Sequence, residues 1–550
     1  QADQQHAHMT HLRLMGMLLV SLLLSGCAQF TPYRIALPAG SAPTGLACEV
    51  PGQLADGSAA PTTLPTCETA DADDALPAPA LQHRHYTSTF RDKTGAADPA
   101  DKGDYFLSFV EFDDQGWFAD RRQMDALFAL LADLKKQKRE TLIYVYAHGW
   151  KHNASPCDNN VVCFSRLVER LDLAEKKIRS DDPARQRTVV GVYLGWRGLP
   201  FGTALNNLSF WSRKDTAARV GRGGVFELLT RLNDYRDSRQ VGKTTDPLRT
   251  QLVITGHSFG GLVVYSALSH ALMARAARTG DTAAGTQYVK VKSFGDFVML
   301  VNPAFEGSLY EPLFHIATQR CYEPGQRPAM MIVTSEADSA TRLAFPAGRA
   351  LSTVLQHAKS PAQQASMLKT IGHNARYVTH DLVDETTGKD APPIVDTADC
   401  GCPYLEPTAT WGQQGLLQLM GGVIAVQAGQ NQYGGDADPS QKTIALKPVP
   451  NASTGSIYTA NYPFLVVKTG ESLIPNQNAI YNERFTTFTQ VFMLSHVLND
   501  TPLPADAGKQ QCLADPRALA PHSEGGLLPA GLSCLNDQGE ACASAGEPAR

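Results

Sequence analysis

The sequence has few of the features that mark nucleic-acid-binding or membrane-spanning proteins. It contains no long basic run, and its formal net charge is only −5 over 550 residues. Charge therefore indicates neither nucleic acid nor an anionic surface as a partner. Charged residues make up 19% of the chain, which is slightly low, whereas apolar residues make up 43% and suffice for a large core. The composition is that of a globular protein.

Metal and redox sites find little support in the sequence. It contains no two Cys-x-x-Cys pairs of the kind that hold structural zinc. We therefore expect neither a metal ion nor another cofactor.

The most apolar run lies near the N-terminus. From Met9 the chain reads MTHLRLMGMLLVSLLLSGC, in which Arg13 precedes an apolar stretch as long as a signal-peptide core and too short to span a bilayer comfortably. The run ends in Leu24-Ser25-Gly26-Cys27, which resembles the lipobox of bacterial lipoproteins. This resemblance implies cleavage before Cys27, lipidation of Cys27 and anchoring at the bacterial cell envelope, with the outer membrane, on its periplasmic or surface side, as the expected place. An ordinary signal peptide that happens to contain a cysteine is the alternative.

The cysteine count agrees with export. Removing Cys27 from the eleven cysteines leaves ten, an even number that suits disulfides in an oxidising compartment. Cys157 and Cys163 flank a polar loop and are the pair we expect first. The other pairings stay open.

Composition divides the chain into segments. A stretch rich in Ala, Pro, Thr and Asp suits a tether between a lipid and a folded body. The expected segments are upstream residues and signal peptide (1–26), linker (27–84), an α/β domain in two pieces (85–341 and 462–499), a cap-like insertion (342–461) and a cysteine-containing tail (500–550).

Apolar strands alternate with amphipathic helices through the central part of the chain. Nearly continuous apolar strands separated by helices are typical of a parallel sheet that is covered on both faces. We therefore expect an α/β fold. The expected strands include DYFLSFVEF, ETLIYVYAHGW, RTVVGVYLGW, QLVITGHSF, FVMLVNPAF, PAMMIVTSEAD and YPFLVVKTG.

The stretch Gly256-His257-Ser258-Phe259-Gly260 follows one of these strands and opens an apolar helix. It resembles the nucleophile elbow of the α/β-hydrolase superfamily, in which the serine occupies a strained strand-to-helix turn and the flanking glycines avoid collisions. The resemblance covers about residues 104–341 and 462–499. It implies an α/β-hydrolase fold with a mostly parallel sheet, helices on both faces and a cap-like insertion after strand 7, with Ser258 as the nucleophile.

A second match is His148-Gly149-Trp150, which resembles the HG motif after the third hydrolase strand. The resemblance implies an oxyanion hole made by the backbone amides of Phe259 and of Gly149 or Trp150, aimed at the charge that develops on the carbonyl oxygen. We expect His148 to shape this loop rather than to transfer protons.

The acid of the implied triad should follow the seventh strand. Asp338 is the first choice and Glu336 the alternative. Glu306, after strand six, is a minor option. Asp296 precedes its strand and should lie at the opposite edge of the sheet.

The histidine departs from the hydrolase pattern. The segment after the last strand, SLIPNQNAIYNERF, has none, and Gln477 and Asn478 stand where one is expected. A glutamine amide cannot take a proton from serine at neutral pH. The insertion offers His380 as first choice and His373 as alternative, although both could be structural. We expect His496, further along, to be structural.

Two functions follow from these motifs. The first is an exported, lipid-anchored serine hydrolase that cleaves a small-molecule or lipid carboxylic ester through an acyl-enzyme on Ser258. The second is a catalytically decayed hydrolase-fold protein that binds a ligand or partner at the cell envelope. The sequence does not separate a lipase from a short-chain esterase.

Overall fold

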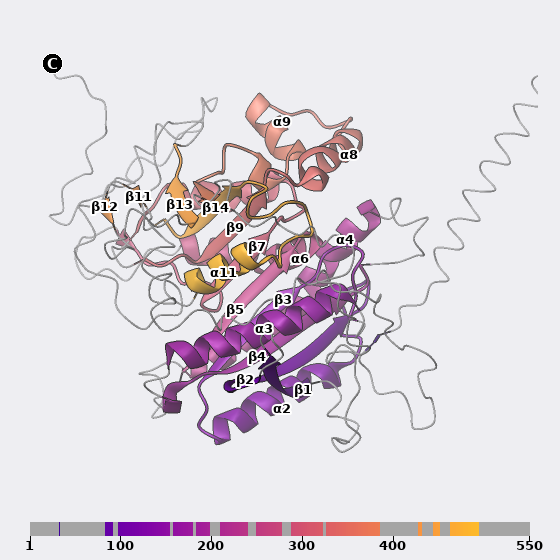
Figure 1. The fold of residues 1–550 in the computed structure, drawn as a ribbon. Helices are drawn as coiled ribbons and strands as arrows, with labels where there is room; N and C mark the ends of the chain where they lie inside the picture. Colours follow the sequence, from indigo (N-terminus) through magenta and orange to yellow (C-terminus); the bar gives the residue numbers. More distant parts are fainter. Residues whose placement is uncertain are drawn as a thin grey trace, which may run out of the picture.

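The chain folds into an α/β structure in which helices cover both faces of one large sheet (Figure 1). The α/β class expected from the sequence is confirmed. The computed structural model describes residues 32–33, 83–91, 97–154, 158–179, 183–198, 210–239, 249–277, 288–322, 326–384, 427–428, 430–431, 444–450 and 462–493.

The main sheet has ten strands in the order β1-β2-β4-β3-β5-β7-β9-β14-β10-β13. Neighbouring strands from β2 to β10 are parallel, and the two edge strands β1 and β13 run antiparallel to their neighbours. The strands are β1 (His83–Arg91), β2 (Ala97–Phe112), β3 (Thr141–Ala147), β4 (Thr188–Trp196), β5 (Thr250–His257), β7 (Phe297–Val301), β9 (Met330–Ser335), β10 (His380–Asp384), β13 (Ile444–Pro448) and β14 (Phe464–Thr469).

Helices and short ladders complete the described structure. The ladders are β6 (Tyr288–Val289) with β8 (Cys321–Tyr322) and β11 (Gln427–Ala428) with β12 (Gln430–Asn431). The helices are α2 (Arg121–Lys136), α3 (Asn159–Ile178), η2 (Pro183–Arg185), α4 (Phe210–Val220), η4 (Gly221–Val225), α5 (Phe226–Ser238), α6 (Phe259–Ala277), α7 (Gly307–Thr318), η5 (Ala340–Ala344), α8 (Phe345–Ser352), α9 (Pro361–Leu368), η6 (Ile371–His373) and α11 (Glu483–Phe492).

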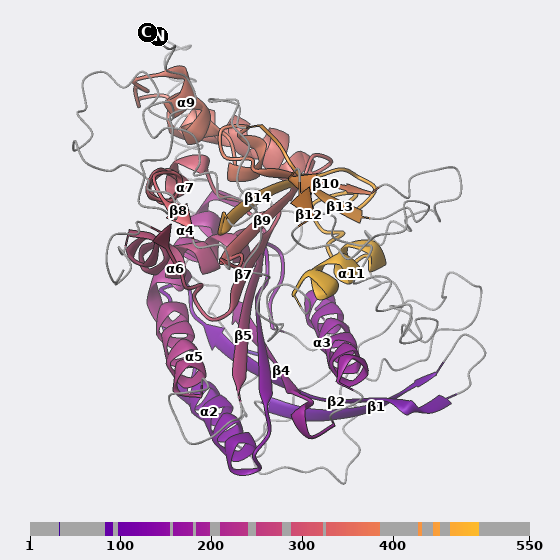
Figure 2. The same ribbon diagram turned by 90° about the vertical axis from the view of Figure 1, so that its left-hand side faces the viewer.

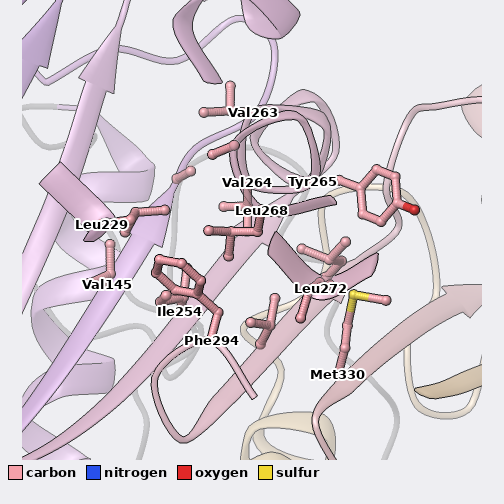
Figure 3. Close-up of a cluster of buried hydrophobic side chains, with 14 of the residues drawn as sticks. Val145, Leu229, Ile254, Val263, Val264, Tyr265, Leu268, Leu272, Phe294 and Met330 are labelled. Atoms are coloured by element: carbon pink, nitrogen blue, oxygen red, sulfur yellow. The ribbon is translucent and has the colours of Figure 1, made fainter. Parts of the chain in front are cut away.

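The sheet separates two apolar layers. Helices α2, α4, α5, α6 and α7 lie on one face, and α3 and α11 lie on the other (Figure 2). Along β5, Ile254 packs into the first layer with Val263 and Leu268 (Figure 3), whereas Val253 packs into the second. Every residue of β5 is buried, as the continuous apolar pattern predicts for a central parallel strand.

The insertion 342–461 does not form a separate cap throughout. Its strand β10 pairs in parallel with β14, and β13 pairs with β10, so these two strands widen the main sheet. At the N-terminal side, β1 and the first part of β2 form a hairpin that begins at His83, two residues before the expected start of the domain at residue 85. Strands pair through backbone N–H and C=O groups, which every residue type other than proline offers in full. The periodicity of the side chains therefore did not predict which distant segments would pair.

Among the described residues, no helix is both long and apolar enough to cross a membrane. The expected lipidation site Cys27, the C-terminal tail and His496 lie outside the described residues.

Candidate active site

Ser258 occupies the sharp turn between β5 and α6. Its φ angle is 56°, in the left-handed region that costs an L-residue about 1–2 kcal/mol. The turn is held from both sides, because the Ser258 N–H donates to Val301 O at 3.0 Å and the Ser258 carbonyl accepts from Ala304 N at 3.1 Å. The strained turn that the sequence predicts is therefore present and is fixed by the end of the neighbouring strand β7.

The glycines around Ser258 permit close approach of three backbone segments. A Cβ atom at Gly256 would lie 2.5 Å from the Gly260 carbonyl oxygen, and one at Gly260 would lie 2.0 Å from Ala147 O at the end of β3. Side chains at either position would collide with backbone. This confirms the steric reason for glycine at both positions.

The loop of His148-Gly149-Trp150 passes directly beside Ser258. A Cβ atom at Gly149 would lie only 2.9 Å from Ser258 Cβ. Phe259 is the first residue of α6, so its N–H has no acceptor within the helix, and the helix N-terminus favours negative charge there. The two backbone segments expected to supply the oxyanion hole, Phe259 and Gly149-Trp150, therefore meet at Ser258.

His148 fixes the shape of this loop. Its Nδ1 atom donates to Gly149 O at 2.9 Å, and its Nε2 atom accepts from Trp196 N at 3.1 Å. The ring stacks on Trp196 with 5.4 Å between centroids. Burial lowers the His148 pKa to about 4. Because both ring nitrogens are engaged, His148 has the structural role expected from the sequence.

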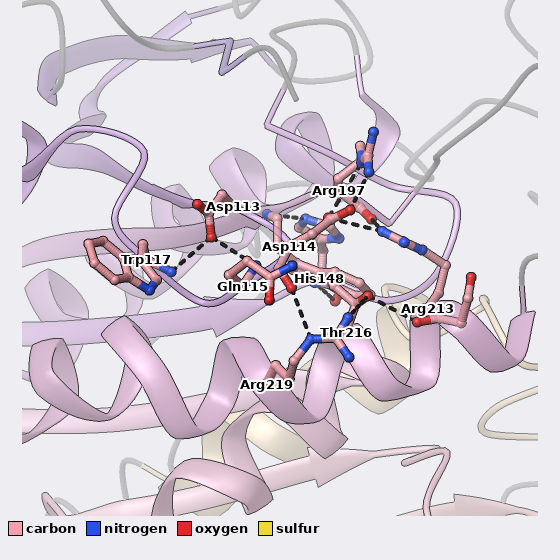
Figure 4. Close-up of polar contacts among 11 residues, drawn as sticks. Asp113, Asp114, Gln115, Trp117, His148, Arg197, Arg213, Thr216 and Arg219 are labelled. Carbon is pink, nitrogen blue, oxygen red and sulfur yellow. Dashed lines mark hydrogen bonds and ion pairs between the residues drawn. The ribbon is translucent and has the colours of Figure 1, made fainter. Parts of the chain in front are cut away.

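A cluster of charges braces the neighbouring strand ends (Figure 4). Asp114, after β2, pairs with Arg197, after β4, and accepts from Arg213 Nη1 at 3.0 Å. Arg213 also donates to Arg197 O at 3.2 Å, and Arg219 Nε donates to Asp114 O at 3.2 Å. The cluster ties β2 and β4 to α4 close to His148.

An aromatic row runs from the nucleophile turn to α8. Phe259 lies 4.7 Å from Phe210, which contacts Trp211 at 5.2 Å, and Trp211 contacts Phe345 at 5.6 Å between ring centroids. Trp150 joins the row through an edge contact with Phe210 at 5.2 Å. The buried Trp150 Nε1 atom has no hydrogen-bond partner in the described part of the chain.

Asp338 is the better placed of the two expected acids. It follows β9 and is fully buried, and Oδ1 accepts the N–H groups of Ala340 and Thr341 at 3.0 and 3.2 Å, while Oδ2 accepts the Thr341 hydroxyl. Burial raises the Asp338 pKa to about 6 against these hydrogen bonds. Glu336, by contrast, is 58% exposed at its side chain and pairs with Lys468.

The two remaining acids are engaged elsewhere. Asp296 bonds to Leu252 N at 2.8 Å, at the opposite end of β5 from Ser258, as expected from its place before β7. Glu306 forms an ion pair of 2.9 Å with Lys214 and a longer one with Arg349.

His373 is connected to Asp338 through Thr341. The His373 Nε2 atom lies 3.0 Å from Thr341 Oγ1. Because the Thr341 hydroxyl donates its proton to Asp338, it must accept from His373 Nε2–H. This tautomer leaves Nδ1 as the basic atom of His373. Burial lowers the His373 pKa to about 4, so the ring is neutral at pH 7.

The short helix η6 holds His373 against the sheet edge. Ile371 N donates to Phe305 O at 3.2 Å, and a Cβ atom at Gly372 would lie 1.9 Å from Thr334 Oγ1 on β9. Phe305 follows Ala304, whose N–H binds the Ser258 carbonyl. His373 therefore lies on a segment bonded to the loop that supports Ser258.

His380, the first choice from the sequence, is not brought to Ser258. It begins β10, which is four strand positions from β5, or roughly 19 Å at about 4.8 Å per strand. His380 is buried, and its Nδ1 atom lies 2.8 Å from Thr379 Oγ1. The segment of His380 forms a strand of the sheet instead of folding back over Ser258, which does not support its choice as the base.

Gln477 lies where the triad histidine was expected. Its carbonyl oxygen accepts from His257 Nε2 at 2.7 Å and from Asn302 Nδ2 at 3.1 Å, and its side-chain amide donates to Asn302 O at 3.3 Å. Asn478 is exposed. The loop after β14 thus reaches the nucleophile turn but brings a glutamine to it.

Sequence reasoning missed two residues at this junction. His257 donates through Nε2, so its buried Nδ1 carries a lone pair without a partner among the described residues, and burial lowers its pKa to about 4. Asn302 has φ 44°, and its Oδ1 accepts from Ser335 N at 2.9 Å. The Asn-Pro pair directly after a buried strand is the signal that could have identified Asn302.

The structure also bears on metals and disulfides. In the ranges that the structure describes, no group of three or more His, Cys, Asp or Glu residues could hold a metal ion. Cys163 forms a disulfide. Its expected partner Cys157 lies outside the described residues, so that pairing stays a prediction.

Comparisons with known proteins add no relative. No family model, curated protein or solved structure matches the chain.

Proposed function

We propose that the protein is a serine hydrolase that cleaves carboxylic esters through an acyl-enzyme on Ser258. The observation that carries the proposal is the strained Ser258 between β5 and α6, with the Gly149 loop beside its Cβ atom. A strained turn persists only where the surrounding structure enforces it, and such turns cluster at functional sites. The strand order and the strand-to-helix elbow support an α/β-hydrolase fold.

The proposed base is His373. Its neutral Nδ1 would take the Ser258 hydroxyl proton as Oγ bonds to the ester carbonyl carbon, and the resulting imidazolium would return that proton to the leaving alkoxide. Water would then attack the acyl carbon, giving a proton to the same nitrogen, and the imidazolium would return that proton to Ser258 Oγ as the acyl C–Oγ bond breaks and the carboxylic acid leaves. Asp338 acts through Thr341, whose hydroxyl holds His373 in the required tautomer.

The developing oxyanion is assigned to backbone amides. The N–H groups of Phe259 and of Gly149 or Trp150 would bind it, as their meeting at Ser258 allows. The aromatic row from Phe259 to Phe345 supports an apolar acyl group in the substrate. The proposed setting is the bacterial cell envelope, with Cys27 carrying the lipid anchor.

The rate of p-nitrophenyl butyrate hydrolysis tests this assignment in four proteins. We expect Ser258→Ala to abolish the rate and His373→Asn to lower it at least a hundredfold, as for loss of a general base. His380→Asn is the matched control, and its rate should stay within threefold of the parent. Full activity of His373→Asn would remove His373 from the mechanism.

A catalytically decayed binding protein is the second candidate, and Gln477 favours it. The loop after β14 reaches the nucleophile turn without a histidine. A parent rate equal to that of Ser258→Ala across acyl lengths, together with no labelling of Ser258 by a fluorophosphonate, would support this candidate over the hydrolase.

A further inference from the structure

An apolar ridge stands exposed on the segment that follows Asp338. We define the ridge as Leu343, Leu351, Val354 and Leu355, whose exposed fractions are 65%, 80%, 76% and 90%. They belong to η5, α8 and the turn after α8, and α8 and α9 lie together at one end of the molecule (Figure 1). Single exposed apolar side chains are ordinary, but here four lie within the thirteen residues 343–355 of one segment.

The opposite side of this segment is fixed to the protein body. Phe345 is fully buried against Trp211, and a Cβ atom at Gly348 would lie 2.0 Å from the Trp211 ring. Arg349 Nε donates to Met367 O at 3.1 Å. With its inner side held in this way, α8 cannot rotate to bury the ridge.

The segment around the ridge is basic, although the whole chain is not. Residues 339–380 contain five Lys and Arg residues and no Asp or Glu. Arg349 and Arg376 pair with Glu306 and Glu311 on other elements. The remaining three, Arg342, Lys359 and Lys369, are exposed on the same segment as the ridge.

We propose that the ridge docks on the surface of an anionic lipid bilayer. Exposed leucines with an exposed lysine and arginine close to them in the chain, Lys359 and Arg342, suit the boundary between headgroups and acyl chains, where apolar side chains leave water and basic ones meet anionic headgroups. A second copy of the chain is disfavoured as the occupant, because a symmetric contact would bring two basic segments together. The inference is independent of hydrolysis at Ser258.

Vesicle sedimentation tests the inference with the full chain carrying Cys27→Ala, so that no lipid anchor contributes. The vesicles are phosphatidylcholine with or without one third phosphatidylglycerol. We expect the double variant Leu351→Asp with Leu355→Asp to bind anionic vesicles at least tenfold more weakly than the parent. Trp117→Asp, at a residue that is 75% exposed in the turn after β2, is the matched control and should bind within twofold of the parent.

Hydrogen exchange distinguishes vesicle binding through the ridge from vesicle binding through the N-terminal apolar run. Amides of 343–356 in the parent should exchange more slowly when phosphatidylglycerol vesicles are added, while those of α2 stay unchanged. Unchanged exchange over 343–356, equal binding by the double variant, or equal binding to vesicles without phosphatidylglycerol would overturn the proposal. A concentration-dependent dimer that is lost in the double variant would assign the ridge to a second copy instead.

Discussion

The carbonyl oxygen of Gln477 lies 2.7 Å from the Nε2 atom of His257, the residue directly before Ser258. This contact places the loop after β14 against the nucleophile turn while assigning it a structural task there. In the proposed hydrolase the proton acceptor would come from elsewhere, and we assign that role to His373, which contacts Asp338 through Thr341.

Thr341 should act as a positioning residue. Thr341→Val removes the hydroxyl that links His373 to Asp338, so we expect kcat to fall at least tenfold with KM nearly unchanged, because the ring loses its tautomer and orientation. Thr341→Ser keeps the hydroxyl and should restore most of kcat. Steady-state kinetics on both variants checks this, and equal kcat for valine and serine would remove Thr341 from the mechanism.

Asp338 should impose an acid limb on the pH profile. Burial raises its pKa to about 6, so the carboxyl becomes protonated below that pH and no longer accepts the Thr341 hydroxyl as an anion. We expect kcat/KM to fall below about pH 6, up to tenfold per pH unit. Asp338→Asn should lower the rate and remove this limb. A parent profile that is flat from pH 5 to 8 would contradict the role of Asp338.

The same carboxyl should affect stability in a defined direction. A carboxyl whose folded pKa is raised stabilises the fold in its neutral form, and this contribution is lost as the pH rises from the unfolded value of 3.8 through about 6. The free energy of unfolding of Asp338→Asn minus that of the parent should therefore be larger at pH 8 than at pH 5. Urea unfolding at the two pH values measures the difference, and a relative loss at pH 8 would refute the assignment.

His380 should contribute to acid sensitivity but not to catalysis. Burial lowers the pKa of His380 to about 4. Between about pH 6.5 and 4 this histidine is therefore protonated in the unfolded chain and neutral in the folded chain. Stability from this group is present above pH 6.5 and falls as the pH drops, by up to about 1.4 kcal/mol per pH unit. We expect His380→Gln to weaken the pH dependence of urea unfolding in this window. An unchanged slope would show that His380 is protonated in the fold.

The glycine at 260 should be intolerant of any side chain. Gly260→Ala would place a Cβ atom 2.0 Å from Ala147 O, and we expect it to destabilise the fold by about 3 kcal/mol. Gly470→Ala is the control, since nothing lies within 4 Å of a Cβ atom there, and should change stability by less than about 0.5 kcal/mol. Thermal unfolding compares the two variants, and we expect a clearly lower Tm for Gly260→Ala. Similar Tm values would contradict the close packing at Gly260.

The elbow could be predicted from the sequence because its signals are local. Glycines at 256 and 260, the apolar strand before them and the helix after them specify the turn within a few residues. The place of Asp338 could be predicted because it lies only three residues after the end of β9. The sequence could not decide between His373 and His380, because their places depend on how a distant segment pairs with β14. The basic segment 339–380 is likewise invisible in a net charge summed over the whole chain.

Detection of an acyl-enzyme tests the proposed role of Ser258. The parent protein is mixed with p-nitrophenyl butyrate, quenched in acid within milliseconds to seconds, digested and examined by mass spectrometry. We predict a butyryl group on the peptide that contains Ser258, absent from Ser258→Ala and longer-lived in His373→Asn, in which deacylation lacks its base. Hydrolysis of the ester with no adduct on Ser258 at any time, and an unchanged rate in Ser258→Ala, would contradict it.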